Sequence, residues 1–146
     1  MKRTAVVTRV INPAALIAEV TSVEVGAISV FLGTVRDTND GRKVTGLDYS
    51  AYTSMAESEL SGIADEAEAR FGVHSLVVEH RVGELSLGEV SVAIVAAHQH
   101  REPAIECARF VIDEIKKRVP IWKREHYADG SRAWVDPTRA TEATAL

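Results

Sequence analysis

Apolar side chains recur at helical spacing in two long segments of this chain, residues 56–71 and 104–119. In each segment the apolar positions fall three or four residues apart, so each is predicted to be a helix with one buried face. Ser54 and Glu57 form a capping-box pattern that predicts the start of the first helix. Pro103 predicts the start of the second helix, because proline is favoured in a first helical turn.

Other segments show the hydrophobic patterns of strands. The run from residue 26 to residue 36 is almost continuously apolar, which predicts a strand that is buried on both faces. The polar residues 37–43 follow it, and their Asp40-Gly41 pair is typical of a hairpin turn. Further strands are predicted at residues 4–10, 44–52, 73–82, 88–98 and 132–135.

The pattern as a whole predicts one α+β domain. Asn12 and Pro13 predict the cap and first turn of a short additional helix. Two long helices and about six strands, partly in hairpins, predict a mixed, mostly antiparallel sheet. The domain is assigned to residues 1–136, since 146 residues fit a single domain, and residues 137–146 are predicted to be a flexible tail.

The composition of the chain limits its expected cellular location and the classes of ligand that it can bind. A net charge of −4 disfavours broad nucleic-acid binding, which usually needs a basic face. No apolar run approaches the ~20 residues that span a bilayer, and the first residues lack the pattern of a secretory signal. The single cysteine, Cys107, lies in an apolar helical pattern and is interpreted as a small buried hydrophobe. We therefore expect a cytoplasmic protein.

Positive charge is concentrated in residues 116–125, against the acidic balance of the chain. Such a concentration usually marks a place that holds an anion, although lysines are also favoured at the C-terminus of a helix. At about 100° per residue, Lys117 points into solvent and Lys116 lies at the border of the apolar stripe. The turn after the helix is predicted to bury Trp122 and to carry Lys123 back towards Lys116. Two neighbouring ammonium groups would lower the pKa of one of them, which suits a nucleophile or a proton-transfer group.

Three further cationic side chains follow predicted strand ends. Arg36 ends the apolar strand, and His100 and Arg101 precede the last helix, where free backbone amides favour an anion. Surface solvation remains an alternative for both arginines. His98 and His100 are spaced like a pair of metal ligands, but no third ligand accompanies them, so no metal site is predicted. Motifs of nucleotide cradles, serine hydrolases and dithiol centres do not occur.

Five segments, in this order and at these separations, together resemble a known family. They are residues 26–36 (GAISVFLGTVR), 47–56 (LDYSAYTSMA), 80–89 (HRVGELSLGE), 97–106 (AHQHREPAIE) and 116–125 (KKRVPIWKRE). The chain is similar in these segments to the catalytic (large) subunit of molybdopterin synthase. The last segment, with a lysine three residues before Val-Pro, is the most specific.

The resemblance implies a fold, a reaction and partners. The fold would be the family's α/β-hammerhead. The activity would be a sulfurtransferase of molybdenum cofactor biosynthesis (EC 2.8.1.12) that converts cyclic pyranopterin monophosphate to molybdopterin. Sulfur would come from the C-terminal thiocarboxylate of a small ubiquitin-like carrier ending in Gly-Gly. The large subunits would form a homodimer, and two carriers would complete a heterotetramer. No bound cofactor, nucleic acid or membrane partner is implied.

The resemblance also assigns residues to the site. Lys116 and Lys123 are the implied catalytic residues, and Arg36, His100 and Arg101 are expected to hold the phosphate, with His100 and Arg101 contributed across the dimer. Glu102 departs from the family pattern and adds a negative charge beside this anion site. The full set of implied substrate-binding residues is Thr34, Val35, Arg36, His100, Arg101, Lys116, Lys123, Arg124 and Glu125.

One alternative belongs to another functional class. A non-catalytic module could bind a ubiquitin-like tail or an anionic metabolite without turnover. The presence of both Lys116 and Lys123 argues against it, because a docking surface need not retain both.

Overall fold

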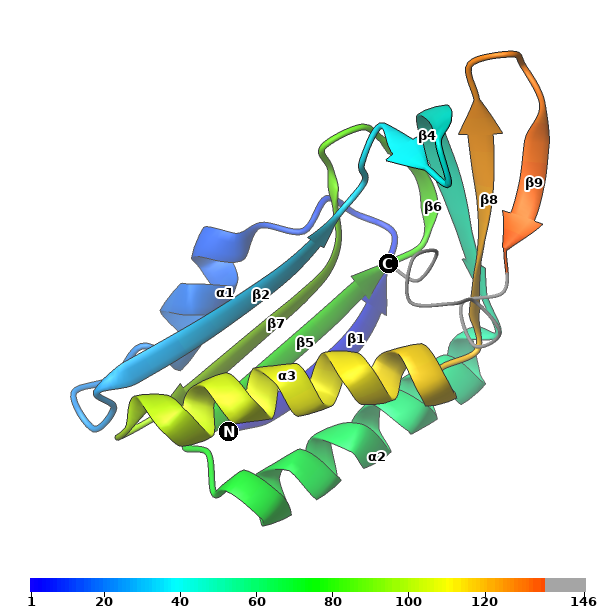
Figure 1. Cartoon of the computed structure of the whole chain (residues 1–146). Coiled ribbons are helices and arrows are strands. Elements are labelled where there is room, and N and C mark those ends of the chain that lie inside the picture. The colour runs from blue at the N-terminus through cyan, green and yellow to red at the C-terminus, as the bar shows by residue number, and fades with distance from the viewer. Residues whose placement is uncertain (136–146) are drawn as a thin grey trace.

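The computed structural model describes residues 1–135 and divides their strands between two sheets (Figure 1). The first sheet is mixed, because one outer strand runs parallel to its neighbour and the other pairs are antiparallel. Its order is β1 (Lys2–Val7), β5 (Ser75–Arg81), β7 (Val90–His98) and β2 (Ala27–Thr34). The second sheet is antiparallel and contains β3 (Thr38–Asn39), β4 (Arg42–Ala51), β8 (Ile121–Tyr127) and β9 (Arg132–Val135), with β6 (Gly83–Ser86) also paired to β4. The predicted α+β class is confirmed, whereas the predicted tail at residues 137–146 lies outside the described residues.

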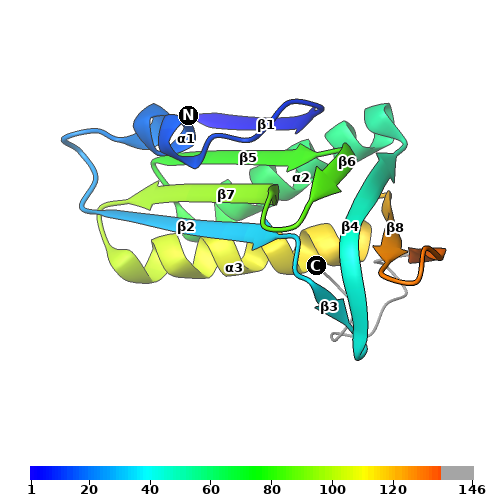
Figure 2. The ribbon, with the colours of Figure 1, turned by 90° about the horizontal axis from the view of Figure 1, so that it is seen from above.

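Helices cover both faces of the first sheet. The long helices α2 (Thr53–Phe71) and α3 (Arg101–Arg118) lie side by side on one face, and α1 (Pro13–Val20) lies on the other (Figures 1 and 2). The central strands β5 and β7 are therefore almost entirely buried. Their side chains alternate between two cores, one under α2 and α3 and one under α1. No helix among the described residues is long and apolar enough to cross a membrane.

The expectation that the apolar run 26–36 is buried on both faces is wrong. Its strand, β2, lies at the edge of the first sheet and pairs only with β7. Val30 and Leu32 are 39% and 37% exposed. A continuous apolar run resembles a central strand in sequence, but it does not determine how many neighbours the strand has.

Two predicted helix starts also differ from the structure. Helix α2 begins at Thr53, with Tyr52 in the cap position and no side-chain cap, so the capping box of Ser54 and Glu57 does not form. The chain passes from β4 into α2 with only Tyr52 between them, which leaves Ser54 inside the first turn. Helix α3 begins at Arg101, two residues before the predicted start at Pro103, because the first turn of a helix accommodates proline.

The start of α1 agrees with its prediction. Asn12 is the N-cap, its side chain accepts a hydrogen bond from the Ala15 amide at 3.3 Å, and Pro13 opens the helix. Three strands, in contrast, are not predicted from the sequence. β3 lies within the predicted hairpin loop 37–43, β6 lies within the predicted connection 83–88, and β8 begins at Ile121, where only a turn is predicted. Trp122 is half-buried rather than buried, with its ring edge-on to Tyr52 at 5.0 Å.

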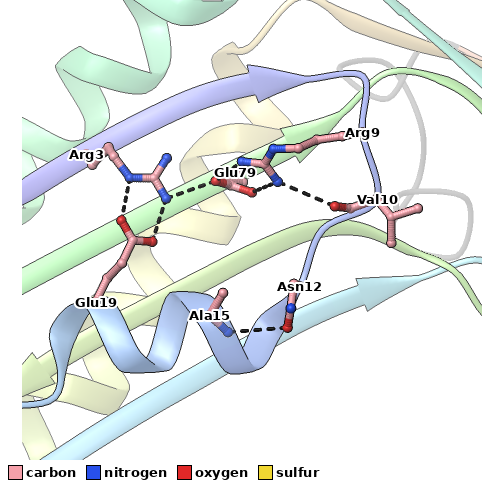
Figure 3. Close-up of polar contacts among 7 residues, drawn as sticks. All are labelled: Arg3, Arg9, Val10, Asn12, Ala15, Glu19 and Glu79. Carbon is pink, nitrogen blue, oxygen red and sulfur yellow. Dashed lines mark hydrogen bonds and ion pairs between the residues drawn. The ribbon is translucent and has the colours of Figure 1, made fainter.

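A network of charged side chains joins β1 and α1 to the central strand β5 (Figure 3). Glu79 of β5 is completely buried and accepts hydrogen bonds from Arg9 at 3.0 and 2.7 Å and from Arg3 at 2.9 Å. Arg3 also binds Glu19 of α1 at 2.9 and 2.7 Å. Burial opposes ionisation of Glu79, but the hydrogen bonds from Arg9 and Arg3 outweigh it and lower the pKa of the carboxyl.

Candidate active site

The alternation of strand β8 separates its charged side chains onto two faces. Burial along β8 follows a strict period of two, so Lys123, Glu125 and Tyr127 point inward, and Arg124 and His126 point to the other face. Lys123 and Glu125 are only 5% and 2% exposed. A buried lysine and a buried glutamate two positions apart on one face are expected to pair, because an isolated charge in a protein interior is strongly unfavourable.

The structure contains this pair together with its supporting contacts. Lys123 Nζ lies 3.3 Å from Glu125 Oε1. Asn39 Nδ2 donates to both carboxylate oxygens of Glu125 at 3.0 Å, and Tyr127 lies near the same carboxylate. The hydrogen bonds from Asn39 hold the carboxylate in place beside the Lys123 ammonium.

The pair lines a narrow cavity of about 20 Å³ where the two sheets meet. Its walls come from the end of β2 and the segment after it, from the β3–β4 hairpin and from β8. Four residues of the implied substrate-binding set besides Lys123 are among the lining residues. The lining residues are Thr34, Val35, Arg36, Thr38, Asn39, Val44, Leu47, Tyr49, Lys123 and Glu125.

Neighbouring cations perturb the ionisation of Lys123. Burial is the largest cause and lowers the pKa of its ammonium, and Glu125 partly opposes this change. Arg36 and Lys116 lower the pKa further by repulsion. Lys116 therefore acts on the Lys123 ammonium by charge, and Arg36 is a second cation that does so.

The last turn of α3 distinguishes Lys116 from its neighbour. Lys116 is half-buried at the end of the helix that leads into β8. Lys117 is 70% exposed and lies 3.3 Å from Glu114 on the same helix, which confirms that it is a solvated charge. Lys116 is thus the less exposed lysine of this turn.

Arg124 does not line the cavity, although it belongs to the implied substrate-binding set. Its guanidinium lies on the opposite face of β8, where it donates to Asp48 Oδ2 at 3.2 and 2.8 Å. It also lies over the ring of Trp134, 5.2 Å from the centroid, and His126 contacts the same Asp48 oxygen at 2.8 Å. The side chain of Arg124 is thus engaged in holding β4, β8 and β9 together.

His100 and Arg101 lie at the other end of α3. They line a separate cavity of about 420 Å³ with Gly26 and Glu102 among its walls. Gly26 is required there, because a Cβ at this position would lie 2.5 Å from the carbonyl oxygen of Gln99. Arg101 and Lys116 are separated by most of α3, about 22 Å at 1.5 Å per residue, so these two side chains do not meet within one chain.

One polar residue of the cavity, Asn39, is missed by the sequence analysis. It lies in the polar segment 37–43, where asparagine is common because it suits turn conformations, so its sequence context carries no signal of a site. Cys107, in contrast, agrees with its interpretation: it is completely buried, and burial raises the pKa of its thiol to about 12. Within residues 1–135, no three histidine, cysteine, aspartate or glutamate side chains gather in a way that could hold a metal ion.

Comparisons with known proteins agree with this fold. The structure of molybdopterin synthase from Staphylococcus aureus has a TM-score of 0.84 and 32% sequence identity, covering 90% of this chain and 95% of that one. A complex of subunits 1 and 2 of molybdopterin-converting factor from Helicobacter pylori has the same fold, with a TM-score of 0.75, 23% identity and coverage of 97% and 92%. The class is therefore that of the α+β proteins of molybdopterin biosynthesis.

The family follows from the sequence comparison. The family model described as MoaE protein matches residues 6–118. The molybdopterin synthase catalytic subunit of Thermoplasma volcanium is 44% identical over 124 residues, covering 85% of this chain and 90% of that protein. The chain belongs to the MoaE family, the family of molybdopterin synthase catalytic subunits. The resemblance seen in the sequence is confirmed.

Proposed function

We propose that the Lys123 cavity is the active site at which this chain converts cyclic pyranopterin monophosphate to molybdopterin. The observation that carries the proposal is the buried Lys123–Glu125 pair in a cavity that Arg36 also lines, with Lys116 near enough to Lys123 to repel its ammonium. The substrate carries a phosphate, and the sulfur donor ends in a negative thiocarboxylate, so both reactants require cations. Three clustered cations in a chain of net charge −4 meet this requirement.

The three cations have different roles in the proposed reaction. Arg36 binds the substrate phosphate through charge-assisted hydrogen bonds. Lys116, half-buried in the last turn of α3, stabilises the negative charge that develops as the thiocarboxylate sulfur attacks the pterin. Lys123, whose pKa is lowered, takes part in proton transfer while Glu125 keeps its ammonium oriented. Cys107 has no part, because the sulfur comes from the carrier.

The sulfur donor in this proposal is a small ubiquitin-like carrier with a C-terminal Gly-Gly thiocarboxylate. The two-subunit composition of the Helicobacter pylori complex supports a partner of this kind. The tail of the carrier ends beside Lys116, and the reaction needs no resident cofactor. The single cysteine of the chain fits a reducing compartment, so the cytoplasm is the proposed location.

A homodimer of large subunits, with one carrier on each, completes the proposed assembly. The support is the separation of about 22 Å along α3 between Arg101 and Lys116, which excludes their contact within one chain. His100 and Arg101 bind the substrate phosphate only if a second copy brings them to the Lys123 cavity. The closed assembly is then a heterotetramer.

Comparing two adjacent lysines tests the proposed function. Purified protein would be mixed with thiocarboxylated carrier and cyclic pyranopterin monophosphate, and the dithiolene product would be followed. Lys116→Ala is expected to reduce turnover by about two or more orders of magnitude, the usual scale for such groups. Lys117→Ala, the matched control on the exposed face of the same turn, should retain wild-type turnover.

Two results would contradict the proposal. Wild-type turnover in the Lys116→Ala variant would remove this lysine from the mechanism. Binding of the carrier by the wild-type protein without any product would favour the alternative, a non-catalytic module.

A further inference from the structure

The side-chain amide of Asn39 has a hydrogen-bonded nitrogen and an oxygen without a hydrogen-bond partner among the described residues. The side chain lies on β3, is 7% exposed and lines the Lys123 cavity. Its Nδ2 donates to both oxygens of Glu125 at 3.0 Å. Its Oδ1 is buried and has no hydrogen-bond partner among residues 1–135. Buried acceptors are almost always paired in folded proteins, so an unpaired one in a cavity wall points to a donor that is brought by a ligand.

The orientation of this amide follows from its neighbour. If the amide were flipped, Oδ1 would face two carboxylate oxygens of Glu125 at 3.0 Å, and acceptor would face acceptor. The Lys123 ammonium lies 3.3 Å from the same carboxylate and is itself a donor, so the carboxylate oxygens act as acceptors here. The nitrogen of Asn39 must therefore face Glu125, and the oxygen is the atom that remains for another partner.

The surroundings restrict what that partner can be. A cavity of about 20 Å³ admits one group of the size of a water molecule and not a whole ring. Lys123 and Glu125 offset each other's charge as an ion pair, and Arg36 leaves the cavity wall with one net positive charge, which disfavours a cationic donor and favours a neutral N–H. Val44, Leu47 and Tyr49 form an apolar part of the wall, against which the edge of a flat heterocycle can rest.

We propose that Asn39 Oδ1 accepts a hydrogen bond from the exocyclic amino group at the edge of the pterin. This inference rests on the proposed function and adds a substrate-binding residue to it. The amino group is a neutral hydrogen-bond donor with a single nitrogen atom, so it is about the size of a water molecule. In a pterin it lies on the edge of the ring opposite the side that carries the phosphate. Asn39 thereby sets which edge of the ring enters the cavity, and the phosphate stays outside the cavity, at the exposed side chain of Arg36.

The inference is tested with two stable ligands that differ at this one group. They are 6-hydroxymethylpterin monophosphate and its lumazine counterpart, in which a carbonyl oxygen replaces the amino group, and both dissociation constants would be measured by calorimetry. The wild-type protein should prefer the amino compound about tenfold or more, because the carbonyl leaves Oδ1 facing another acceptor. Asn39→Ala should abolish this preference, and Lys43→Ala, an exposed residue of the same hairpin outside the cavity wall, should keep it.

A double-mutant cycle separates direct contact from an effect through Glu125. If Asn39 contacts the ligand, Asn39→Ala lowers the preference for the amino compound in the Glu125→Gln protein as it does in the wild type. Loss of that effect in the Glu125→Gln background would overturn the inference and leave Asn39 with a positioning role only.

The outcomes also distinguish the inference from the proposed function. Equal affinity of the wild-type protein for both ligands, with turnover intact, would overturn the inference alone. Failure of the wild-type protein to bind either ligand and to form product would overturn both. Thermal unfolding of each variant would confirm that it is folded, and Asn39→Ser replaces Asn39→Ala if the latter does not fold.

Discussion

Lys123 and Glu125 show how single residues at this site depend on the residues around them. A buried ion pair is often no more stable than an apolar pair of the same shape, because both charges lose their hydration. Here the carboxylate has Asn39 as a further partner and Tyr127 nearby, and the ammonium lies near Arg36 and Lys116. The arrangement therefore contributes a perturbed ammonium rather than stability, as is typical of catalytic sites.

His80 gives a prediction about pH at the same scale. It is completely buried in β5, its ring is edge-on to Tyr49, and burial lowers its pKa from 6.5 to about 4. The unfolded chain therefore binds a proton on His80 at a higher pH than the folded chain does. The stability that this histidine contributes is complete above its unfolded pKa and is lost as pH falls from 6.5 towards about 4.

The corresponding variant is His80→Leu. The free energy of unfolding of the wild type should fall between about pH 7 and about pH 4.5, and the variant should show a fall smaller by about 2 kcal/mol. Urea denaturation at both pH values measures this difference. Equal falls in the two proteins would show that His80 is not kept neutral by the fold.

The sequence predicts the cations of the site better than their partners. Lys116 at the border of a helical stripe, Lys117 in solvent and Cys107 in the core follow from helical periodicity, and the structure agrees with all three. The partners of Lys123 could not be predicted, because Asn39 reaches Glu125 from 86 positions away in the chain. The family resemblance supplied the site residues as a set, but it did not indicate that Arg124 faces the other side of its strand.

At the scale of elements, the network around Glu79 determines how β1 and α1 are attached to the sheet. Strand β1 pairs only with β5, and α1 packs on β5 and β7 (Figure 1). Arg3 on β1 contacts both Glu79 and Glu19, so a single guanidinium joins all three elements (Figure 3). This attachment therefore combines the apolar core under α1 with the charged network.

Replacing the two arginines tests this attachment. Arg3→Met and Arg9→Met should each have a small effect, because the other guanidinium still pairs with Glu79. The double variant leaves a completely buried carboxylate without a partner, and such a loss costs about 3–5 kcal/mol. Chemical denaturation of the wild type, the two single variants and the double variant measures the coupling free energy between Arg3 and Arg9. Arg109→Met is the control, because the side chain of Arg109 is 84% exposed. Strictly additive effects would contradict the prediction.

The elements themselves were predictable to different degrees. Helical stripes of 16 residues give a strong signal, so α2 and α3 are recovered with errors of a few residues at their starts. β8 alternates in burial as clearly as any strand, yet its inward residues include Lys123 and Glu125, so its hydropathy does not alternate. Because charged side chains are buried on β8, a search for alternating hydrophobic residues does not predict this strand.

At the scale of the whole molecule, α3 keeps two cationic sites apart. His100 and Arg101, at the start of the helix, line one cavity, and Lys123, on the strand that follows the end of the helix, lines the other. A ligand that needs both can be bound only between two copies.

Mixing two inactive variants tests this arrangement. Arg101→Ala and Lys116→Ala should each have low turnover alone. After they are unfolded and refolded together, mixed dimers have one site with both defects and one with neither, so about a quarter of wild-type turnover should return. Turnover no higher than the mean of the two variants would contradict a shared site, and sedimentation of each sample would confirm its assembly state.

The passage from α3 into β8 has a consequence for how this chain tolerates changes in length. Only Val119 and Pro120 separate the helix from the strand, and Lys116 and Lys123 are seven positions apart. Because a strand alternates, gain or loss of a single residue here would turn β8 over and exchange Lys123 and Glu125 for Arg124 and His126. Deletions and insertions are thus far more damaging in this passage than substitutions at its exposed positions. The hairpin at Asp40-Gly41, whose turn faces solvent, is where the chain can vary in length.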